Sequence, residues 1–195
     1  DITESTTLSR DSGYYIPHEM LIASPSVLTI EEGVDMQFFN DDLMVEGAIN
    51  AKGTEQNPIH MKGSRESSGY FKPGIFVDNT EATSTFSHIV VEGLYGISAN
   101  SGNVVIENST FSDNDYGVVL FNGSTAEITN TEFSRTKREA LSAYDGSVLS
   151  VASSTILSSL GRDAIDVFDG SLTINNVVID GVKKGDGVGV YDSTF

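Results

Sequence analysis

Apolar and polar residues alternate along most of this chain in short runs, and one such run recurs at a nearly constant interval. Its copies begin at Gly117, Ala140, Ala164 and Gly187, so they lie 23, 24 and 23 residues apart. Alternation with a period of two is typical of β-strands, and no segment keeps apolar residues at helical spacing for long. A strand repeat of this length predicts a solenoid in which each copy is one coil.

Two further apolar columns keep the same period, five residues apart, and consist of Ile106, Ile128, Val151 and Ile174 and of Phe111, Phe133, Ile156 and Ile179. Between them runs a polar column made of Asn108, Asn130, Ser153 and Asn176. Stacked amides can bond the coils above and below, and asparagine tolerates left-handed backbone. We therefore predict an internal asparagine ladder at a bend, with Asn108 inaccessible and His88, in the same column, in a structural role.

These repeats resemble the right-handed parallel β-helix superfamily, which has the pectate-lyase-like fold, and in particular its short-repeat members on or outside microbial cells. The segments 28–34 and 43–47 resemble the first coils of such exported proteins, and 71–77 resembles the segment that opens their regular repeats. The resemblance implies an all-β, single-domain solenoid with coils of roughly 22–24 residues.

Regularity changes along the chain and predicts its organisation. Residues 1–15 are polar and show no clear repeat, so we expect an N-terminal leader or cap. The parallel β-helix is expected over 16–195, with irregular first coils at 16–80 and regular coils at 81–195. The chain begins at Asp1 without a signal-peptide pattern, as a mature exported protein or an excised fragment would.

Composition narrows the set of partners. Lys and Arg number 11 against 28 Asp and Glu, which gives a formal net charge of −17. This charge argues against nucleic acid and anionic membranes as partners. No apolar run reaches the length of a membrane span, so we expect no membrane insertion. The chain has no cysteine, which excludes disulfides, thiolate zinc sites and a cysteine nucleophile.

The alternation within the recurring run assigns its faces. Val118 and Leu120 point inward with their equivalents, so the aromatic column that follows should point outward or lie at a corner. The predicted binding residues are this column and its polar neighbours, namely Phe121, Tyr144, Phe168, Tyr191, Asn122, Asp145, Asp169 and Asp192. Aromatic rings stack on sugar faces and carboxylates accept hydroxyl bonds. The alternative is structural, because cross-strand aromatic pairs stabilise sheets by roughly 0.2–1 kcal/mol each.

Asp145, Asp169 and Asp192 raise a question of their own. Carboxylates about 5 Å apart repel by roughly 1 kcal/mol in water, and a shared calcium ion at these three residues would relieve that repulsion. Asp-Gly is also ordinary turn chemistry, and we expect the turn role first. Calcium is thus the single candidate cofactor, and the sequence indicates no other.

Charged residues gather in the loops that follow the Phe111 column, and they comprise Arg135, Lys137, Arg138, Arg162, Lys183 and Lys184 with Asp113, Asp115, Glu139, Asp163 and Asp186. One hypothesis is a groove for acidic polysaccharide; the other, which we favour, is a solvated corner of weakly paired charges. If the chain is an enzyme, the residues to test are Asp163, Asp166, Arg138 and Arg162. Coil stacking brings acids to catalytic separations in any case, so that spacing is no evidence.

Nearly uniform coils favour an exported, non-catalytic surface, adhesion or structural module that binds extracellular polysaccharide or a surface protein along the aromatic and acidic column. The alternative is a polysaccharide lyase or glycoside hydrolase acting on acidic polysaccharide, so the question of catalysis stays open. We also expect self-association through the coil ends, because strand edges and apolar core there have no visible cover.

Overall fold

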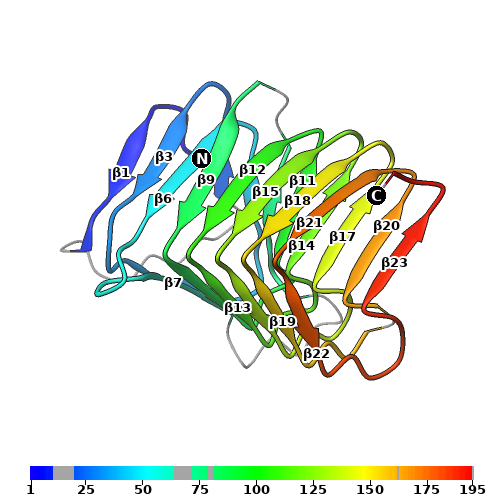
Figure 1. Cartoon of the computed structure of the whole chain (residues 1–195). Helices are drawn as coiled ribbons and strands as arrows, with labels where there is room; N and C mark the ends of the chain where they lie inside the picture. The colour runs from blue at the N-terminus through cyan, green and yellow to red at the C-terminus, as the bar shows by residue number, and fades with distance from the viewer. Residues whose placement is uncertain (11–19, 64–71, 79–80, 162, 195) are drawn as a thin grey trace.

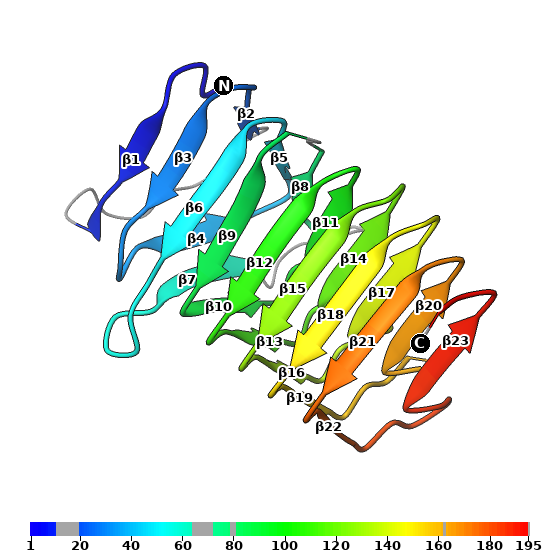
Figure 2. The same cartoon turned by 45° about the horizontal axis from the view of Figure 1, so that its top comes forward.

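Strands stack into a parallel β-solenoid with three sheets, as the coloured coils of Figure 1 and Figure 2 show from two directions. The computed structural model describes residues 1–10, 20–63, 72–78, 81–161 and 163–194. The three sheets are called A, B and C. From residue 27 onward the chain passes through sheets B, C and A in turn, and all strand pairs are parallel. The predicted all-β solenoid is confirmed.

Each sheet collects one strand from successive coils. Sheet B contains β1 (Thr6–Leu8), β3 (Val27–Ile30), β6 (Ala48–Lys52), β9 (Thr83–Ser87), β12 (Asn103–Glu107), β15 (Thr125–Thr129), β18 (Val148–Ala152) and β21 (Ser171–Asn175). Sheet C contains β4 (Asp35–Phe38), β7 (Ile59–Gly63), β10 (Ile89–Glu92), β13 (Thr110–Ser112), β16 (Glu132–Ser134), β19 (Thr155–Leu157) and β22 (Val178–Asp180). Sheet A contains β2 (Met20–Ile22), β5 (Leu43–Val45), β8 (Ile75–Val77), β11 (Ile97–Asn100), β14 (Val118–Phe121), β17 (Leu141–Tyr144), β20 (Ile165–Phe168) and β23 (Val188–Tyr191).

The register matches the period of the sequence. In sheet B, Ile106 pairs with Ile128, Ile128 with Val151 and Val151 with Ile174. Stacking therefore turns each sequence column into a ladder along the solenoid axis. The ladders that point inward fill one continuous apolar core; within it the rings of Phe111 and Phe133 are fully buried and stack with centroids 4.9 Å apart.

The solenoid begins earlier than expected. The segment 1–15 was predicted to be a leader or cap, and its described part contains β1, which pairs with β3. Ile2 also forms a bridge to Ile22. The stretch 63–69 is rich in serine and glycine, which predicts a protruding loop, and it lies mostly outside the described residues. Within those described, no helix has the length and apolar character that crossing a membrane would need.

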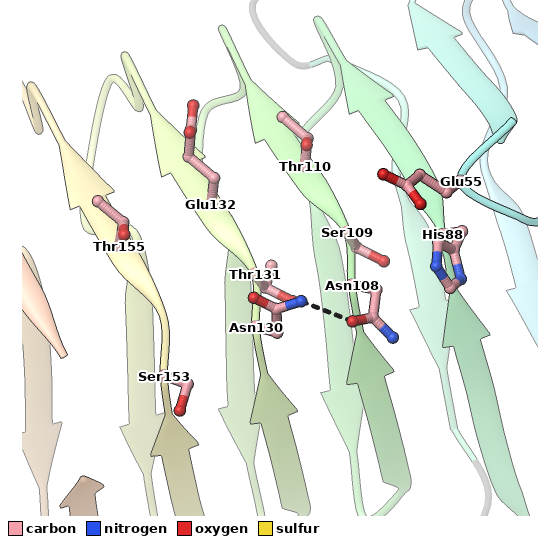
Figure 3. Close-up of a pocket in the computed structure, with 10 residues that line it drawn as sticks. All are labelled: Glu55, His88, Asn108, Ser109, Thr110, Asn130, Thr131, Glu132, Ser153 and Thr155. Atoms are coloured by element: carbon pink, nitrogen blue, oxygen red, sulfur yellow. Dashed lines mark hydrogen bonds between the residues drawn. The ribbon is translucent and has the colours of Figure 1, made fainter. Parts of the chain in front are cut away.

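The asparagine column lies at the bend between sheets B and C, where one residue per coil has left-handed backbone. Asn108 and Asn130 have φ of 50° and 49°, and Asn130 Nδ2 donates to Asn108 Oδ1 at 2.6 Å. The stacked ladder is confirmed, but the prediction that Asn108 is inaccessible was wrong, because its side chain is exposed. The left-handed turn directs this side chain to solvent (Figure 3) and sends the next one inward.

The internal ladder at this bend is instead a column of hydroxyl groups one residue later. Ser109, Thr131 and Ser154 are buried. The Ser109 Oγ accepts from the backbone N–H of Ile89 at 3.2 Å and donates to the carbonyl of Glu107 at 2.6 Å. These hydroxyls pair backbone groups that the sharp turn leaves without a strand partner.

Candidate functional site

The outer face of sheet A carries the predicted aromatic column along its edge with sheet B. Register pairs Tyr144 with Phe168 and Phe168 with Tyr191, so the rings ascend the solenoid one per coil. The rings of Phe121 and Tyr144 stack, with centroids 5.4 Å apart and planes inclined by 22°. Phe168 and Tyr191 are 47 % and 48 % exposed. The predicted outward direction of this column is therefore confirmed.

The ring of Tyr191 lies over a residue without a side chain. A Cβ atom on Gly189 would come within 3.0 Å of Tyr191 Cε2 and 2.8 Å of Asp163 Oδ2. The phenol ring and the Asp163 carboxylate thus both reach across Gly189 on the outer face of β23. Gly189 lets the Tyr191 ring approach the backbone closely while almost half of the residue remains open to solvent.

One acid of this face is engaged by the aromatic column. The Tyr144 hydroxyl donates to Asp166 Oδ2 in the next coil at 3.0 Å. Burial raises the pKa of Tyr144, and the nearby Asp166 carboxylate raises it further. Tyr144 therefore remains a protonated donor at neutral pH, and one Asp166 oxygen is held by it.

The polar neighbours of the rings form the apex of the corner between sheets A and B. Asn122, Asp145, Asp169 and Asp192 have φ of 53°, 55°, 49° and 48°, which confirms the turn role. The Asn122 side chain donates to Asn100 Oδ1 at 2.6 Å. The three aspartates are exposed, and their carboxylates form no hydrogen bond or ion pair with the described residues.

These aspartates stand one per coil in a line. Within the described part of the chain, no three acidic or histidine side chains converge as a metal site requires. Asp145, Asp169 and Asp192 follow paired strand residues in successive coils, so their carboxylates are strung along the axis instead of around a point. The geometry gives the calcium hypothesis no support.

A second aromatic column, which the sequence analysis missed, begins with Phe76 in the middle of β8 and continues with Tyr95 and Tyr116 at the edge of sheet A that faces sheet C. The ring centroids of Phe76 and Tyr95 are 5.5 Å apart, and those of Tyr95 and Tyr116 are 5.1 Å apart. Arg138 continues the column, with its Cζ 5.5 Å from the centre of the Tyr116 ring and its Nη1 donating to the Tyr116 hydroxyl at 3.2 Å. Burial raises the pKa of Tyr95 to about 12.

The strand residues between the two aromatic columns are buried, although they point outward from the sheet. Ser98, Val119 and Ser142 point outward from β11, β14 and β17, yet they are 6 %, 1 % and 0 % exposed. They form the floor of a face whose two walls are aromatic. Toward the C-terminal coils this floor continues with Asp166 and Gly189.

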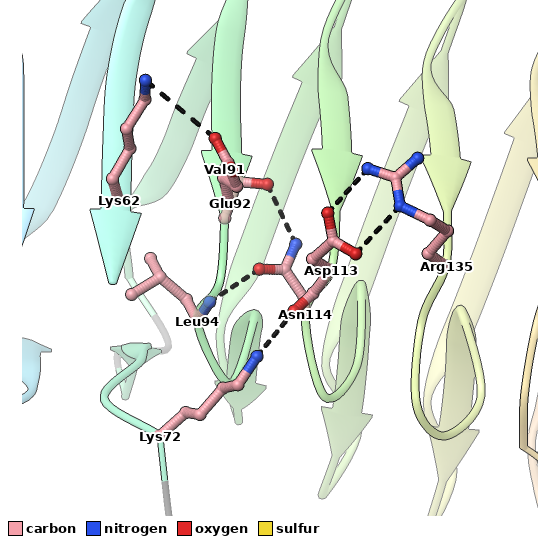
Figure 4. A network of polar contacts seen from close by, with 8 residues as sticks. All are labelled: Lys62, Lys72, Val91, Glu92, Leu94, Asp113, Asn114 and Arg135. Atoms are coloured by element: carbon pink, nitrogen blue, oxygen red, sulfur yellow. Dashed lines mark hydrogen bonds and ion pairs between the residues drawn. The ribbon is translucent and has the colours of Figure 1, made fainter. Parts of the chain in front are cut away.

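Part of the charged corner between sheets C and A is paired within the molecule (Figure 4). Arg135 binds Asp113 in the preceding coil through two hydrogen bonds, of 2.9 Å and 2.6 Å. Lys137 and Lys72 approach one Asp115 oxygen at 3.1 Å and 3.7 Å. Burial lowers the pKa of Lys72, and the neighbouring Lys137 lowers it further. These contacts agree with the interpretation of these loops as a corner of paired charges.

A buried amide fixes the backbone of the same corner. Asn114 Oδ1 accepts from the backbone N–H of Leu94 at 2.8 Å, and its Nδ2 donates to the carbonyl of Val91 at 3.0 Å (Figure 4). Lys72 Nζ also donates to the Asp113 carbonyl at 2.6 Å. The corner is therefore held by side chains that bond backbone groups of neighbouring segments.

The described residues among those named for testing in case the chain is an enzyme form contacts within the fold. Asp163 is 8 % exposed, and its Oδ1 accepts from the backbone N–H of Asp186 at 2.8 Å. Asp166 is held by Tyr144, and Arg138 lies on the Tyr116 ring. Arg162 lies outside the described residues. Arg138 and Asp163 both precede strands of sheet A, and the Ser159 hydroxyl contacts the backbone carbonyls of both, at 3.2 Å and 3.4 Å. Asp166 lies on β20 beside Gly189 of β23, which the Asp163 carboxylate also approaches.

A polar groove of about 480 Å³ follows the asparagine column between sheets B and C (Figure 3). Glu55 and His88 lie at one end of it and Thr155 at the other. The Nδ1 atom of His88 lies 3.0 Å from the Ser87 hydroxyl. The lining residues of the groove include no Phe, Tyr or Trp, which distinguishes it from the face of sheet A.

Comparison with known families identifies the fold. The family described as "Right handed beta helix region" matches residues 48–195, which is well over half of the chain. The chain belongs to this right-handed β-helix family. No curated protein and no solved structure matches this β-helix chain. Membership confirms the resemblance seen in the repeats, but β-helix solenoids host many activities, so function must be argued from the site.

Proposed function

We propose that this β-helix is a non-catalytic module outside the cell, where it holds an extracellular glycan along its corner strip. The corner strip consists of Phe121, Tyr144, Phe168 and Tyr191 with Asn122, Asp145, Asp169 and Asp192. The observation that carries the proposal is the line of two half-exposed rings, Phe168 and Tyr191, beside free carboxylates. Exposed apolar groups gathered in one place mark interaction sites more often than scattered ones do.

The strip offers both kinds of contact that a sugar needs. Aromatic rings pack against the apolar faces of pyranose rings, and carboxylates or amides accept hydroxyl protons. Coils rise by about 4.8 Å, which is close to the length of one pyranose residue in an extended chain. A glycan that runs along the solenoid axis can therefore meet an equivalent ring and an equivalent polar group at each coil.

The scaffold holds these groups in place before any ligand arrives. Each apex residue is fixed in a left-handed turn, and the backbone N–H of Gly123 donates to the Asp145 carbonyl at 2.9 Å. Asn122 is tied to Asn100 as well. Preorganised side chains lose little conformational freedom on binding, which favours affinity.

The contacts of the acids support a non-catalytic role. A hydrolase requires one carboxyl to donate a proton and another to act as base or nucleophile. Asp163 is buried and bound to a backbone N–H, and one Asp166 oxygen accepts from Tyr144. Structural contacts thus engage one carboxylate oxygen of each acid, which supports a scaffolding role for both.

Affinity electrophoresis and calorimetry against a panel of neutral, acidic and amino polysaccharides test the proposal. Phe168→Ala should weaken binding by about tenfold, equivalent to about 1.4 kcal/mol. Phe39→Ala is the matched control, because Phe39 is also exposed, at 40 %, but lies outside the corner strip. Sugar release assayed on the same panel should show no turnover. Robust turnover that Asp166→Asn abolishes would establish an enzyme instead.

A further inference from the structure

We infer that the corner strip selects a glycan with free amino groups, that is, a polymer of the glucosamine type, over neutral or acidic glycans. The inference rests on the proposed function and assigns the chemical class of the ligand at the same strip. Its evidence is the charge, the linear arrangement and the aromatic surroundings of three carboxylates, those of Asp145, Asp169 and Asp192.

The strip is negative and has no internal counter-charge. None of its eight side chains is basic. No Lys, Arg or His nitrogen among the described residues lies within 4.0 Å of the carboxylates of Asp145, Asp169 or Asp192. This contrasts with the corner between sheets C and A, where Asp113 and Asp115 are paired. A uronate chain would therefore be repelled at the strip, whereas an ammonium group would find an unpaired acid.

The linear arrangement favours an extended polycation over a metal ion. Neighbouring carboxylates about 5 Å apart repel by roughly 1 kcal/mol in water, and a positive charge at each coil removes that repulsion. A divalent cation needs several ligands around one point, and the described residues contain no such group. A glucosamine chain carries one amine on each pyranose residue, so its positive charges are spread along a line, as the three carboxylates are.

The spacing also distinguishes a sugar chain from a basic peptide. An extended peptide rises by about 3.3 Å per residue, so side chains on one of its faces recur at about 6.6 Å. That interval does not match acids that recur with the coil rise of about 4.8 Å. The length of one pyranose unit is closer to the coil rise, so a sugar chain stays near register over the two coils of Phe168 and Tyr191.

The rings beside the acids complete the chemistry. Ammonium groups are attracted to aromatic faces, and apolar sugar faces pack on them as well. Tyr191 lies over Gly189 and is 48 % exposed, and Phe168 is 47 % exposed. An amino sugar at these two coils would place its ring on the aromatic residue and its amine toward Asp169 or Asp192.

The test compares three six-residue oligosaccharides by calorimetry: glucosamine, N-acetylglucosamine and galacturonate. It is run on the whole chain at a pH where the amines are charged and the carboxylates ionised. The glucosamine oligomer should bind at least about tenfold more tightly than either of the others, with affinity that falls as salt rises. The paired variant Asp169→Asn/Asp192→Asn should abolish that preference. Asp180→Asn, an exposed acid on sheet C, should preserve it.

The outcomes separate the two proposals. If all three oligomers bind equally, and Phe168→Ala weakens them while the Asp→Asn pair does not, the amino-sugar inference is wrong and the glycan-binding function stands. If none of the three binds, the amino-sugar inference is wrong, and binding to the wider polysaccharide panel decides whether the glycan-binding function stands. An oligolysine of equal charge that binds as tightly as the glucosamine oligomer would also overturn the inference, because the strip would then recognise charge alone. Thermal unfolding of each variant verifies that the fold is intact.

Discussion

Tyr144 donates its hydroxyl proton to Asp166 in the following coil, across 3.0 Å. The bond joins the aromatic column to the floor of the same sheet, so two features that looked separate in the sequence form one surface. It also engages one carboxylate oxygen of Asp166, the candidate catalytic acid on β20.

Removing this hydroxyl should weaken the fold slightly. Tyr144→Phe keeps the ring stacked on Phe121 but deletes the donor to Asp166, and we expect a loss of about 0.5–1.5 kcal/mol in the free energy of unfolding. Tyr191→Phe is the control, because the Tyr191 hydroxyl has no bonded partner among the described residues. Denaturant unfolding measures both. Equal effects of the two substitutions would mean that the Tyr144 bond contributes nothing.

At the bend between sheets B and C, the left-handed backbone of Asn130 and its side-chain amide should contribute separately to the free energy of unfolding. Asn130→Gly removes the bond to Asn108 and tolerates the φ of 49°, so it should cost about 0.5–1.5 kcal/mol. Asn130→Ala adds left-handed strain of roughly 1–2 kcal/mol. Thr129→Ala, an exposed neighbour, should change stability by less than about 0.5 kcal/mol. Identical unfolding energies for the alanine and glycine variants of Asn130 would contradict this explanation.

Two glycines at the same position of the repeat should differ in how replacement by alanine changes the free energy of unfolding. A Cβ on Gly117 would lie 2.4 Å from the Ala140 carbonyl oxygen and 2.5 Å from the Phe133 ring, so Gly117→Ala should destabilise by about 1–3 kcal/mol. A Cβ on Gly187 would meet Ile179 at 3.8 Å, an ordinary contact. Gly187→Ala should therefore be neutral or stabilising by about 0.4–1 kcal/mol. Thermal and chemical unfolding compare them, and equal losses would rule out the proposed clash.

Stability should fall at high pH because of Tyr95. Burial raises its pKa from 10.0 to about 12, so between these values the unfolded chain has released a proton that the folded chain still holds. The unfolding free energy then decreases as pH rises through this window, since the unfolded state binds fewer protons. Tyr95→Phe should remove that part of the slope. An unchanged slope in this variant would show that Tyr95 does not titrate abnormally.

The repeat in the sequence predicted the core because stacking converts each column into a ladder of like side chains. Ile106, Ile128 and Val151 illustrate this, since their spacing alone gave the register of sheet B. The exposure of Asn108 could not be predicted from the column, because it depends on a left-handed turn that reverses the direction of the side chain.

The column formed by Tyr95, Tyr116 and Arg138 was missed for a different reason. Arg138 is a different residue type from Tyr116 and lies one position before its equivalent, because Gly117 aligns with Ala140, so the column that both share with Tyr95 does not look like a repeat. The signal was nevertheless present, because tyrosine precedes Gly96 and Gly117 in the same way. The hydrogen bond between Arg138 and Tyr116 joins residues 22 apart, as does the bond between Arg135 and Asp113. Adding one coil length to a residue number therefore finds such partners.

The measurement that tests the central claim most directly is a titration followed by backbone amide chemical shifts, with the glycan that binds most tightly in the panel. The account predicts that shifts change in the corner strip and its adjoining turns, at residues 121–123, 144–146, 168–170 and 191–193. Changes confined to the polar groove beside His88 and Asn108, or to the neighbourhood of Arg138, would contradict the claim. So would an unchanged spectrum with every glycan tested.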